Sequence, residues 1–236
     1  MTFKAVLFDF SGTLFRIESA GSWLQAVLDE AGHSVPPDEV RRYAMRLAVA
    51  GALPGGPSPQ QVPPDLADVW AARDASAQQH RAAYTGLARQ VPLPLPTLYD
   101  ALYERHMTPA AWRPYADAAE VLGALRRGGL GIAVVSNIGW DLRPVFRAHG
   151  LDAFVDAYVL SYEHGIQKPD ARLFETACEE LGQDPHDVLM VGDDRRADGG
   201  AVQLGCTVHF VDHLPVEERP AGLRPVLDLA GQGPRS

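Results

Sequence analysis

The first hydrophobic stretch of the chain is a short apolar run that ends on a carboxylate. Four apolar residues lie between Lys4 and Asp9, and the turn-forming residues Ser11, Gly12 and Thr13 follow. A short apolar run that stops at a turn is typical of a buried parallel strand. Ligands bind at the carboxyl ends of such strands. Asp9 is therefore either a functional carboxylate or the N-cap of a following helix.

After the turn at Gly12 and Thr13 the hydrophobic spacing becomes helical and stays so as far as Thr108. Apolar faces predict helices around residues 23–28, 36–48, 65–75, 76–90 and 96–106, with no strand between Ile17 and Thr108. Residues 53–64 are rich in Pro, Gly, Ser and Gln, which predicts a surface loop.

From Pro109 onward, apolar strand patterns alternate with helical ones. Strands are predicted at 131–136, 157–160, 187–192 and 207–211, and helices at 116–127, 142–149, 172–181 and 201–204. This order predicts an α/β fold with a doubly wound, parallel, Rossmann-like sheet. We expect a discontinuous core domain of residues 1–15 and 109–236, and an all-helical cap domain of residues 16–108 over the carboxyl edge of the sheet. The tail from Leu214 has weak periodicity and is expected to end frayed.

Composition and charge exclude several classes of function. The chain has 236 residues, 46% of them hydrophobic, and a net charge of −9 with a pI near 5.3, so it offers no basic stripe for nucleic acid. It has no signal-like N-terminus and no apolar run of about eighteen residues, so we expect a cytoplasmic protein without a membrane partner. Cys206, His209 and His213 could suggest zinc, but Cys206 and His209 would face opposite sides of a strand.

Polar groups follow four of the predicted strands, where a parallel sheet would gather them at one edge. These groups are Asp9, Ser136 with Asn137, Lys168, and the acidic set Asp193, Asp194 and Asp198. Taken singly, Ser136 and Asn137 could form a helix cap, and the acidic set could be an exposed ion-pair turn. Lys168 is one of only two lysines in the chain, which favours a specific role at its strand-end loop.

Together these groups suit phosphoryl chemistry. An aspartate at position 9 can attack phosphorus to form an aspartyl-phosphate. Asp193 with a second acid can hold Mg²⁺, which prefers carboxylate oxygens. Lys168 supplies positive charge, and the Ser136 hydroxyl supplies a donor for phosphoryl oxygens.

In order, spacing and residue type, these groups resemble the motifs of the haloacid dehalogenase superfamily of hydrolases. The matching segments are Asp9 to Leu14, Ser136, Lys168, and Gly192 to Asp198. The resemblance implies a helical cap and an Mg²⁺-dependent phosphatase that acts through an aspartyl-phosphate on Asp9. It assigns catalytic roles to Asp9, Ser11, Ser136, Asn137 and Lys168, substrate binding to Gly12, Thr13, Ser136, Asn137 and Lys168, and metal binding to Asp9, the backbone carbonyl of Ser11, Asp193, Asp194 and Asp198.

One residue departs from the family pattern. Phosphatases of the family carry an aspartate as general acid and base two residues after the nucleophile, where this chain has Ser11. General acid-base help is worth roughly a hundred- to ten-thousand-fold, so we expect slowed turnover. The alternatives are a dehalogenase-type hydrolase that attacks carbon, which in this family needs no metal, and a catalytically weak descendant that binds a ligand or partner.

The sequence leaves the small-molecule substrate and the oligomeric state open. We expect a phosphorylated substrate chosen by side chains of the cap. The cap residues considered for this choice are Arg16, Glu18, Trp23, Arg41, Arg42, Tyr43 and Arg46.

Overall fold

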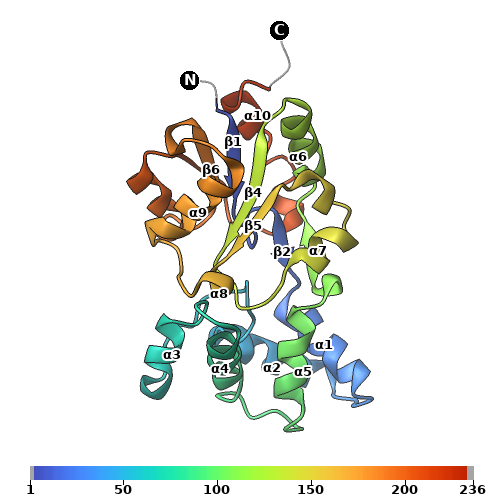
Figure 1. Cartoon of the computed structure of the whole chain (residues 1–236). Coiled ribbons are helices and arrows are strands. Elements are labelled where there is room, and N and C mark those ends of the chain that lie inside the picture. The colour runs from blue at the N-terminus through green and yellow to red at the C-terminus, as the bar shows by residue number, and fades with distance from the viewer. Residues whose placement is uncertain (1–2, 233–236) are drawn as a thin grey trace.

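The centre of the protein is a five-stranded parallel sheet, seen in a computed structural model that describes residues 3–232 (Figure 1). Its strands are β1 (Ala5–Phe8), β4 (Gly131–Ser136), β5 (Ala157–Leu160), β6 (Val188–Gly192) and β7 (Thr207–Phe210). The order β5-β4-β1-β6-β7 places β1 in the middle. The predicted parallel α/β fold is confirmed, and the residue after β1, Asp9, lies at the centre of the carboxyl edge.

Strand β1 occupies the middle of the sheet because both of its faces are apolar. Its four residues are fully buried, and successive side chains point to opposite sides. Val6 and Phe8 join one hydrophobic cluster, whereas Ala5 and Leu7 join the other. β1 pairs with β4 on one side and with β6 on the other, with Phe8 opposite both Val134 and Val191.

Helices cover both faces of the sheet. Helices α6 (Ala118–Arg127), α7 (Arg143–Ala148) and α10 (Pro225–Leu229) contribute to the cluster on one face. Helix α9 (Ala171–Leu181) packs on the other face through Leu173, Phe174, Ala177 and Cys178. The short helix α8 (Ser161–His164) follows β5 at the carboxyl edge. Cys178 and Cys206 are both free and buried.

Five helices lie together beyond the carboxyl edge of the sheet, at the bottom of Figure 1. They are α1 (Ala20–Glu30), α2 (Pro37–Val49), α3 (Ala67–Ala71), α4 (Ala77–Ala88) and α5 (Leu98–His106), called the helical insert below. Ser19 and Ser76 cap α1 and α4, each accepting a hydrogen bond from a backbone amide three residues later. The five helical segments were predicted, with ends that differ by a few residues. The division into two domains at residues 16 and 108 stays a prediction.

The structure corrects the prediction for the start of the insert. Residues after the Gly12 turn form a strand, β2 (Phe15–Ile17), antiparallel to β3 (Trp112–Pro114). Phe15 and Ile17 are buried and Arg16 between them is partly exposed, so the segment has strand alternation that its short length disguises. These two strands carry the chain from the sheet to the insert and back.

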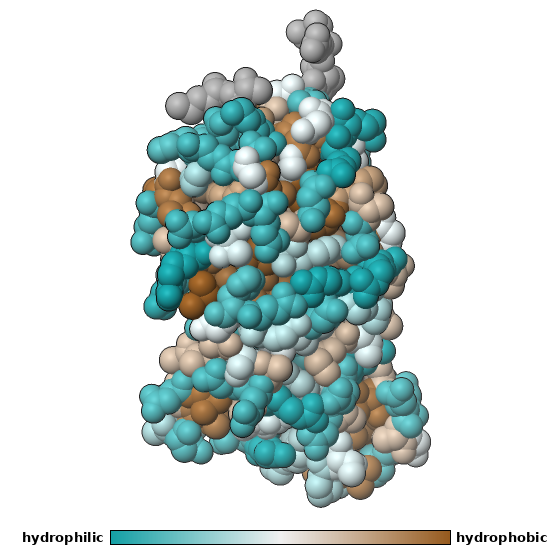
Figure 2. Space-filling view, in the orientation of Figure 1, coloured by the Kyte–Doolittle hydropathy of each residue, from teal (hydrophilic) through white to brown (hydrophobic). Residues whose placement is uncertain are grey.

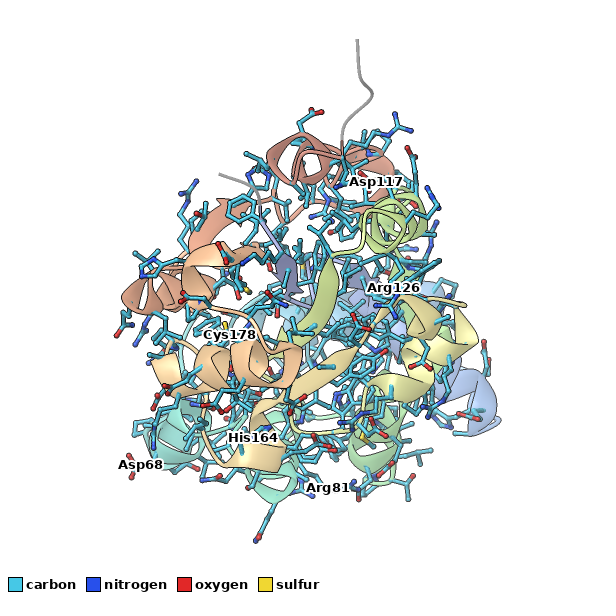
Figure 3. The ribbon with its side chains drawn as sticks, turned by 45° about the horizontal axis from the view of Figure 1, so that its top comes forward. Asp68, Arg81, Asp117, Arg126, His164 and Cys178 are labelled. Atoms are coloured by element: carbon cyan, nitrogen blue, oxygen red, sulfur yellow. The ribbon has the colours of Figure 1, made fainter. Side chains whose placement is uncertain are left out.

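Three further segments differ from the prediction. The loop at 53–64 is not wholly on the surface, because Leu53 is buried. Residues 198–204 form a 3-10 helix, Asp198–Leu204, like the shorter ones at Pro64–Leu66, Pro109–Ala111, Asp152–Phe154, Pro185–Asp187 and Val216–Glu218. The tail packs firmly, because Asp117 Oδ2 accepts hydrogen bonds from the amides of Leu223 (2.7 Å) and Arg224 (3.1 Å), near the C-terminal helix in Figure 3. The frayed end was expected at residues that include 233–236, which lie outside the described part.

The face shown in Figure 2 is mostly hydrophilic, with apolar residues in separate small groups. Within residues 3–232, every helix is too short or too polar to cross a membrane.

Candidate active site

The polar groups at the strand ends line one cavity between the sheet and the helical insert. Its volume is about 760 Å³. The sheet side is formed by the ends of β1, β4 and β6 and the loops that follow β5 and β7. The predicted residues on this side are Asp9, Ser11, Ser136, Asn137, Lys168, Asp193, Asp194 and Asp198. Gly12 and Thr13, which were expected to bind substrate, are not among the lining residues.

Lys168 is the centre of a buried ionic network. Its Nζ donates to Asp9 Oδ1 (2.7 Å), to Asp198 Oδ1 (2.6 Å) and to the carbonyl of Val135 (2.9 Å). Burial by itself lowers the pKa of Lys168, but the charges of Asp198 and Asp9 outweigh it, and the net pKa is raised. The ammonium therefore stays charged at neutral pH. Removing one partner of such a buried ion pair leaves the other charge uncompensated, which is strongly unfavourable.

Asn137 holds the backbone of Lys168 in place. Its Oδ1 accepts from the amide of Lys168 (2.7 Å), and its Nδ2 donates to the carbonyl of the same residue (3.0 Å). Both ends of the side-chain amide are thus used on the loop. The catalytic and substrate-binding roles expected for Asn137 stay predictions, and its observed contacts are with the backbone of Lys168. Ser136, at the end of β4, is only 2% exposed and lines the cavity.

Three carboxylates converge next to Lys168. One oxygen from each of Asp9, Asp193 and Asp198 lies within 4.8 Å of the others. Burial raises the pKa of Asp9 well above its usual range, and the charge of Lys168 opposes this shift. Burial also acts to raise the pKa of Asp193, yet hydrogen bonds and charges, first those of His213, hold it below its usual range. Such hard oxygen donors fit Mg²⁺.

The three carboxylates differ in how many of their oxygens already accept hydrogen bonds. Asp198 uses Oδ1 for Lys168 and accepts the amide of Asp194 (2.9 Å) at Oδ2. Asp9 uses only Oδ1 in hydrogen bonds among residues 3–232. Asp194 lies outside this trio: it is exposed, and its Oδ1 accepts the amides of Arg196 (2.8 Å) and Ala197 (2.9 Å). Asp193 uses Oδ1 for the Thr13 hydroxyl and Oδ2 for His213, so of the three only Asp9 keeps an oxygen without a hydrogen bond within residues 3–232.

The turn after Asp9 fits tightly between two other segments. Gly12 has φ +91°, and a Cβ there would lie 2.3 Å from His213 Nδ1 and 2.5 Å from Asp193 Oδ2. The Thr13 hydroxyl is buried and donates to Asp193 Oδ1 (3.2 Å). Ser11 faces the insert: a Cβ on Gly55, which has φ +76°, would lie 2.8 Å from Ser11 Oγ. The insert thus reaches Ser11, at the position where phosphatases of the family carry the general acid.

Two residues at this turn were not predicted. His213 contacts Asp193 through Nδ1 and Arg16 through Nε2. Arg219, 4% exposed, donates to the carbonyls of Gly12 (2.6 Å), Asp212 (2.9 Å) and Thr13, and its guanidinium stacks 3.2 Å from the ring centroid of Tyr115. Arg219 lies in the tail, whose weak periodicity carries no sign that it returns to the first turn.

On the insert side, the cavity is lined by residues other than those considered from the sequence. They are Leu53, Pro54, Gly55, Gly56, Pro57, Ser58, Trp70, Ala71, Arg73, Asp74, His80 and Tyr84. Arg16, Glu18, Trp23, Arg41, Arg42, Tyr43 and Arg46 are all absent from the lining. Helical periodicity identifies which residues share a face but not which face meets the sheet.

With this geometry in place, comparison with known proteins decides the family. Residues 3–203 match the family described as haloacid dehalogenase-like hydrolase. The chain belongs to this family. The resemblance inferred from the four motifs is confirmed, and the protein is a haloacid dehalogenase-like hydrolase.

Relatives in this family divide between two chemistries. The chain is 30% identical over 202 residues to N-acetylmuramic acid 6-phosphate phosphatase of Pseudomonas aeruginosa, covering 83% of this chain and 76% of the relative. It is 37% identical over 93 residues to (S)-2-haloacid dehalogenase 4A of Burkholderia cepacia, covering 39% of this chain and 40% of the relative. The match thus spans about two fifths of that dehalogenase.

Solved structures agree with the fold. A crystal structure of a dehalogenase superposes with a TM-score of 0.67 at 24% identity, covering 96% of both chains. The putative HAD-hydrolase YfnB of Bacillus subtilis, bound to magnesium, superposes with a TM-score of 0.68 at 15% identity, covering 98% of this chain and 100% of the other. At these identities the likeness concerns the fold.

Proposed function

We propose that this hydrolase is an Mg²⁺-dependent phosphatase of a small phosphorylated metabolite, with Asp9 as the nucleophile. The observation that carries the proposal is the convergence of Asp9, Asp193 and Asp198 within 4.8 Å beside a buried lysine. Three acids with one lysine have an excess of negative charge that a divalent cation would balance. The relatives that are phosphatases are consistent with this chemistry.

In the proposed reaction, Asp9 attacks the phosphorus of the ester. Lys168 holds Oδ1, so Oδ2 is the attacking oxygen. A bond forms between Oδ2 and phosphorus while the ester oxygen leaves with its electron pair. Water then attacks the same phosphorus, which releases inorganic phosphate and restores the Asp9 carboxylate. Mg²⁺, held by Asp9, Asp193 and the backbone carbonyl of Ser11, would neutralise charge on the phosphoryl oxygens.

The remaining residues orient and neutralise the phosphoryl group. Lys168 is fixed by Asp198 and by the side chain of Asn137, so its charge is in place before substrate binds. Ser136 lines the same cavity, and its hydroxyl can donate to a phosphoryl oxygen. Ser11 cannot act as a carboxylic acid, so the leaving oxygen takes its proton from solvent. Esters with good leaving groups are therefore the favoured substrates.

A dehalogenase-type reaction is the second candidate. It is favoured by Ser11, because expulsion of halide needs no proton, and by the haloacid dehalogenases among the relatives. In that reaction Asp9 would attack carbon, and the carboxylates of Asp193 and Asp198 would have no cation to bind.

One experiment separates the two candidates. Phosphate release from an aryl phosphate and halide release from a 2-haloacid are measured with Mg²⁺ and with a chelator, in wild type and Asp193→Asn. We expect phosphate release that needs Mg²⁺ and falls at least a hundredfold in Asp193→Asn. Asp228→Asn, at an exposed site on α10, is the matched control. Halide release in the chelator with no phosphate release would overturn the proposal.

A further inference from the structure

The turn between α3 and α4 of the insert is docked beside Lys168. The amide of Asp74 donates to Gln167 Oε1 (2.7 Å), and the carbonyl of Asp74 accepts from Ser161 Oγ (2.6 Å). Gln167 Nε2 also donates to the carbonyl of Ala71 (2.9 Å). Gln167 directly precedes Lys168, so the position of Asp74 is tied to that of the phosphoryl-binding lysine.

The carboxylate of Asp74 is buried without a hydrogen bond. Asp74 is only 4% exposed and lines the cavity. Among residues 3–232 no hydrogen bond ends on its carboxylate: Arg73 Nε is 3.4 Å from Oδ2 and His80 Nε2 is 3.8 Å from Oδ1, both in the ion-pair range only. Burial raises the pKa of Asp74. A carboxylate this deeply buried without a hydrogen bond is unfavourable, and a partner that comes from the cavity would satisfy it.

Arg73 and His80 complete this wall. The guanidinium of Arg73 lies 4.1 Å from the ring centroid of Trp70 and donates from Nη1 to the carbonyl of Trp70 (3.0 Å), while its buried Nε has no hydrogen-bond partner within the described residues. His80 Nδ1 pairs with the hydroxyl of Tyr103 (2.8 Å), and burial lowers the pKa of His80 well below its usual range, so the ring is neutral. The wall therefore presents one free acceptor group beside one fixed cation.

We propose that Asp74, next to Arg73, binds the hydroxyl groups of a polyol or sugar phosphate whose phosphate lies at Asp9 and Lys168. Arg73 already balances the charge of Asp74, so a neutral hydroxyl satisfies the carboxylate, whereas an ammonium would bring a second cation against Arg73. The cavity of about 760 Å³ lies within the usual range for small-molecule sites. This inference names the substrate class of the proposed phosphatase and rests on that function for the position of the phosphate.

The test compares esters that differ only in their polar groups. Wild type, Asp74→Ala, Asp74→Asn and Asp68→Ala are assayed with glucitol phosphate, hexyl phosphate and aminohexyl phosphate. Asp68 is the matched control, because it lies exposed on α3 and points away from the body of the protein (Figure 3). Asp74→Ala should raise KM for glucitol phosphate roughly tenfold or more beyond any change in KM for hexyl phosphate. Asp74→Asn, which keeps one acceptor, should fall between.

Binding to the Asp9→Asn variant, measured by calorimetry, separates this inference from the proposed function. If wild type releases no phosphate but Asp9→Asn still prefers glucitol phosphate through Asp74, the function fails and the binding site stands. Equal affinity for glucitol and hexyl phosphates, or equal loss for both in Asp74→Ala, overturns the inference. A preference for aminohexyl phosphate that depends on Asp74 would also overturn it, in favour of a cationic ligand.

Discussion

Replacing Arg219 by Met tests whether the C-terminal tail supports the active-site turn. The guanidinium donates to the backbone carbonyls of Gly12, Thr13 and Asp212. Gly12 and Thr13 are buried, whereas Asp212 is exposed and can bind water instead. A buried acceptor that loses its donor costs about 1–3 kcal/mol, so two of them predict a loss of about 2–6 kcal/mol in the free energy of unfolding.

For a chain of this size, each kcal/mol lowers the melting temperature by about 2–4 °C, so Arg219→Met should melt at least about 4 °C below wild type. Arg224→Met is the matched control, because within residues 3–232 the Arg224 side chain makes only an exposed ion pair with Glu120, which is worth about 0–1 kcal/mol.

The Arg219→Met substitution should also weaken the binding of Mg²⁺. Thr13 bonds Asp193, and the turn carries the carbonyl of Ser11, so a loosened turn disturbs the proposed Mg²⁺ site. We expect the Mg²⁺ concentration for half-maximal phosphate release to rise roughly tenfold in Arg219→Met and to stay unchanged in Arg224→Met, a loss of about 1.4 kcal/mol in metal binding. Identical melting and identical Mg²⁺ dependence in the two variants would refute this role for Arg219.

Two further predictions concern acid stability and the residue after the nucleophile. Burial lowers the pKa of His106 to about 3. Because the folded-state pKa is below the unfolded one, the neutral ring contributes to the free energy of unfolding above the unfolded pKa. This contribution is lost as pH falls from about 6.5 toward 3, by up to about 1.4 kcal/mol per pH unit. Urea unfolding between pH 7 and pH 5 should show a shallower decline for His106→Phe than for the exposed control His164→Phe, and equal slopes would contradict the assignment. Ser11→Asp should raise turnover of alkyl phosphates about tenfold by supplying the missing acid, provided that the Gly55 loop moves aside; a folded, Mg²⁺-binding variant with no gain would favour the dehalogenase-type reaction.

The sheet could be predicted closely because its strands are buried on both faces. The strands at 131–136 and 157–160 were predicted to the residue, since each is a continuous apolar run bounded by turn or helix residues. That the polar groups after the strands gather at one edge of the sheet could be predicted from the parallel topology alone. β2 and β3 could not be predicted in this way, because each has three residues and its partner lies far away in the chain.

The residues that line the insert side of the cavity could not be predicted either, for a different reason. The side chains of Arg73 and Asp74 reach the cavity because the turn that carries them docks on Gln167 and Ser161. Arg219 reaches Gly12 only because the tail packs beside α6. Such contacts join segments distant in the chain, and no local pattern of hydrophobic and polar residues encodes them.

The most direct test of the account is to look for phosphate on Asp9. Wild type is mixed with an aryl phosphate and Mg²⁺, quenched in acid, digested and analysed by mass spectrometry, with Asp9→Asn as the control. Because Ser11 cannot act as general base for the attacking water, the aspartyl-phosphate should accumulate and aryl alcohol should appear in a burst before slow turnover. A phosphoryl group on the peptide that contains Asp9, absent in Asp9→Asn and in chelator, is the predicted result. Turnover without that adduct, or unchanged turnover in Asp9→Asn, would contradict the account.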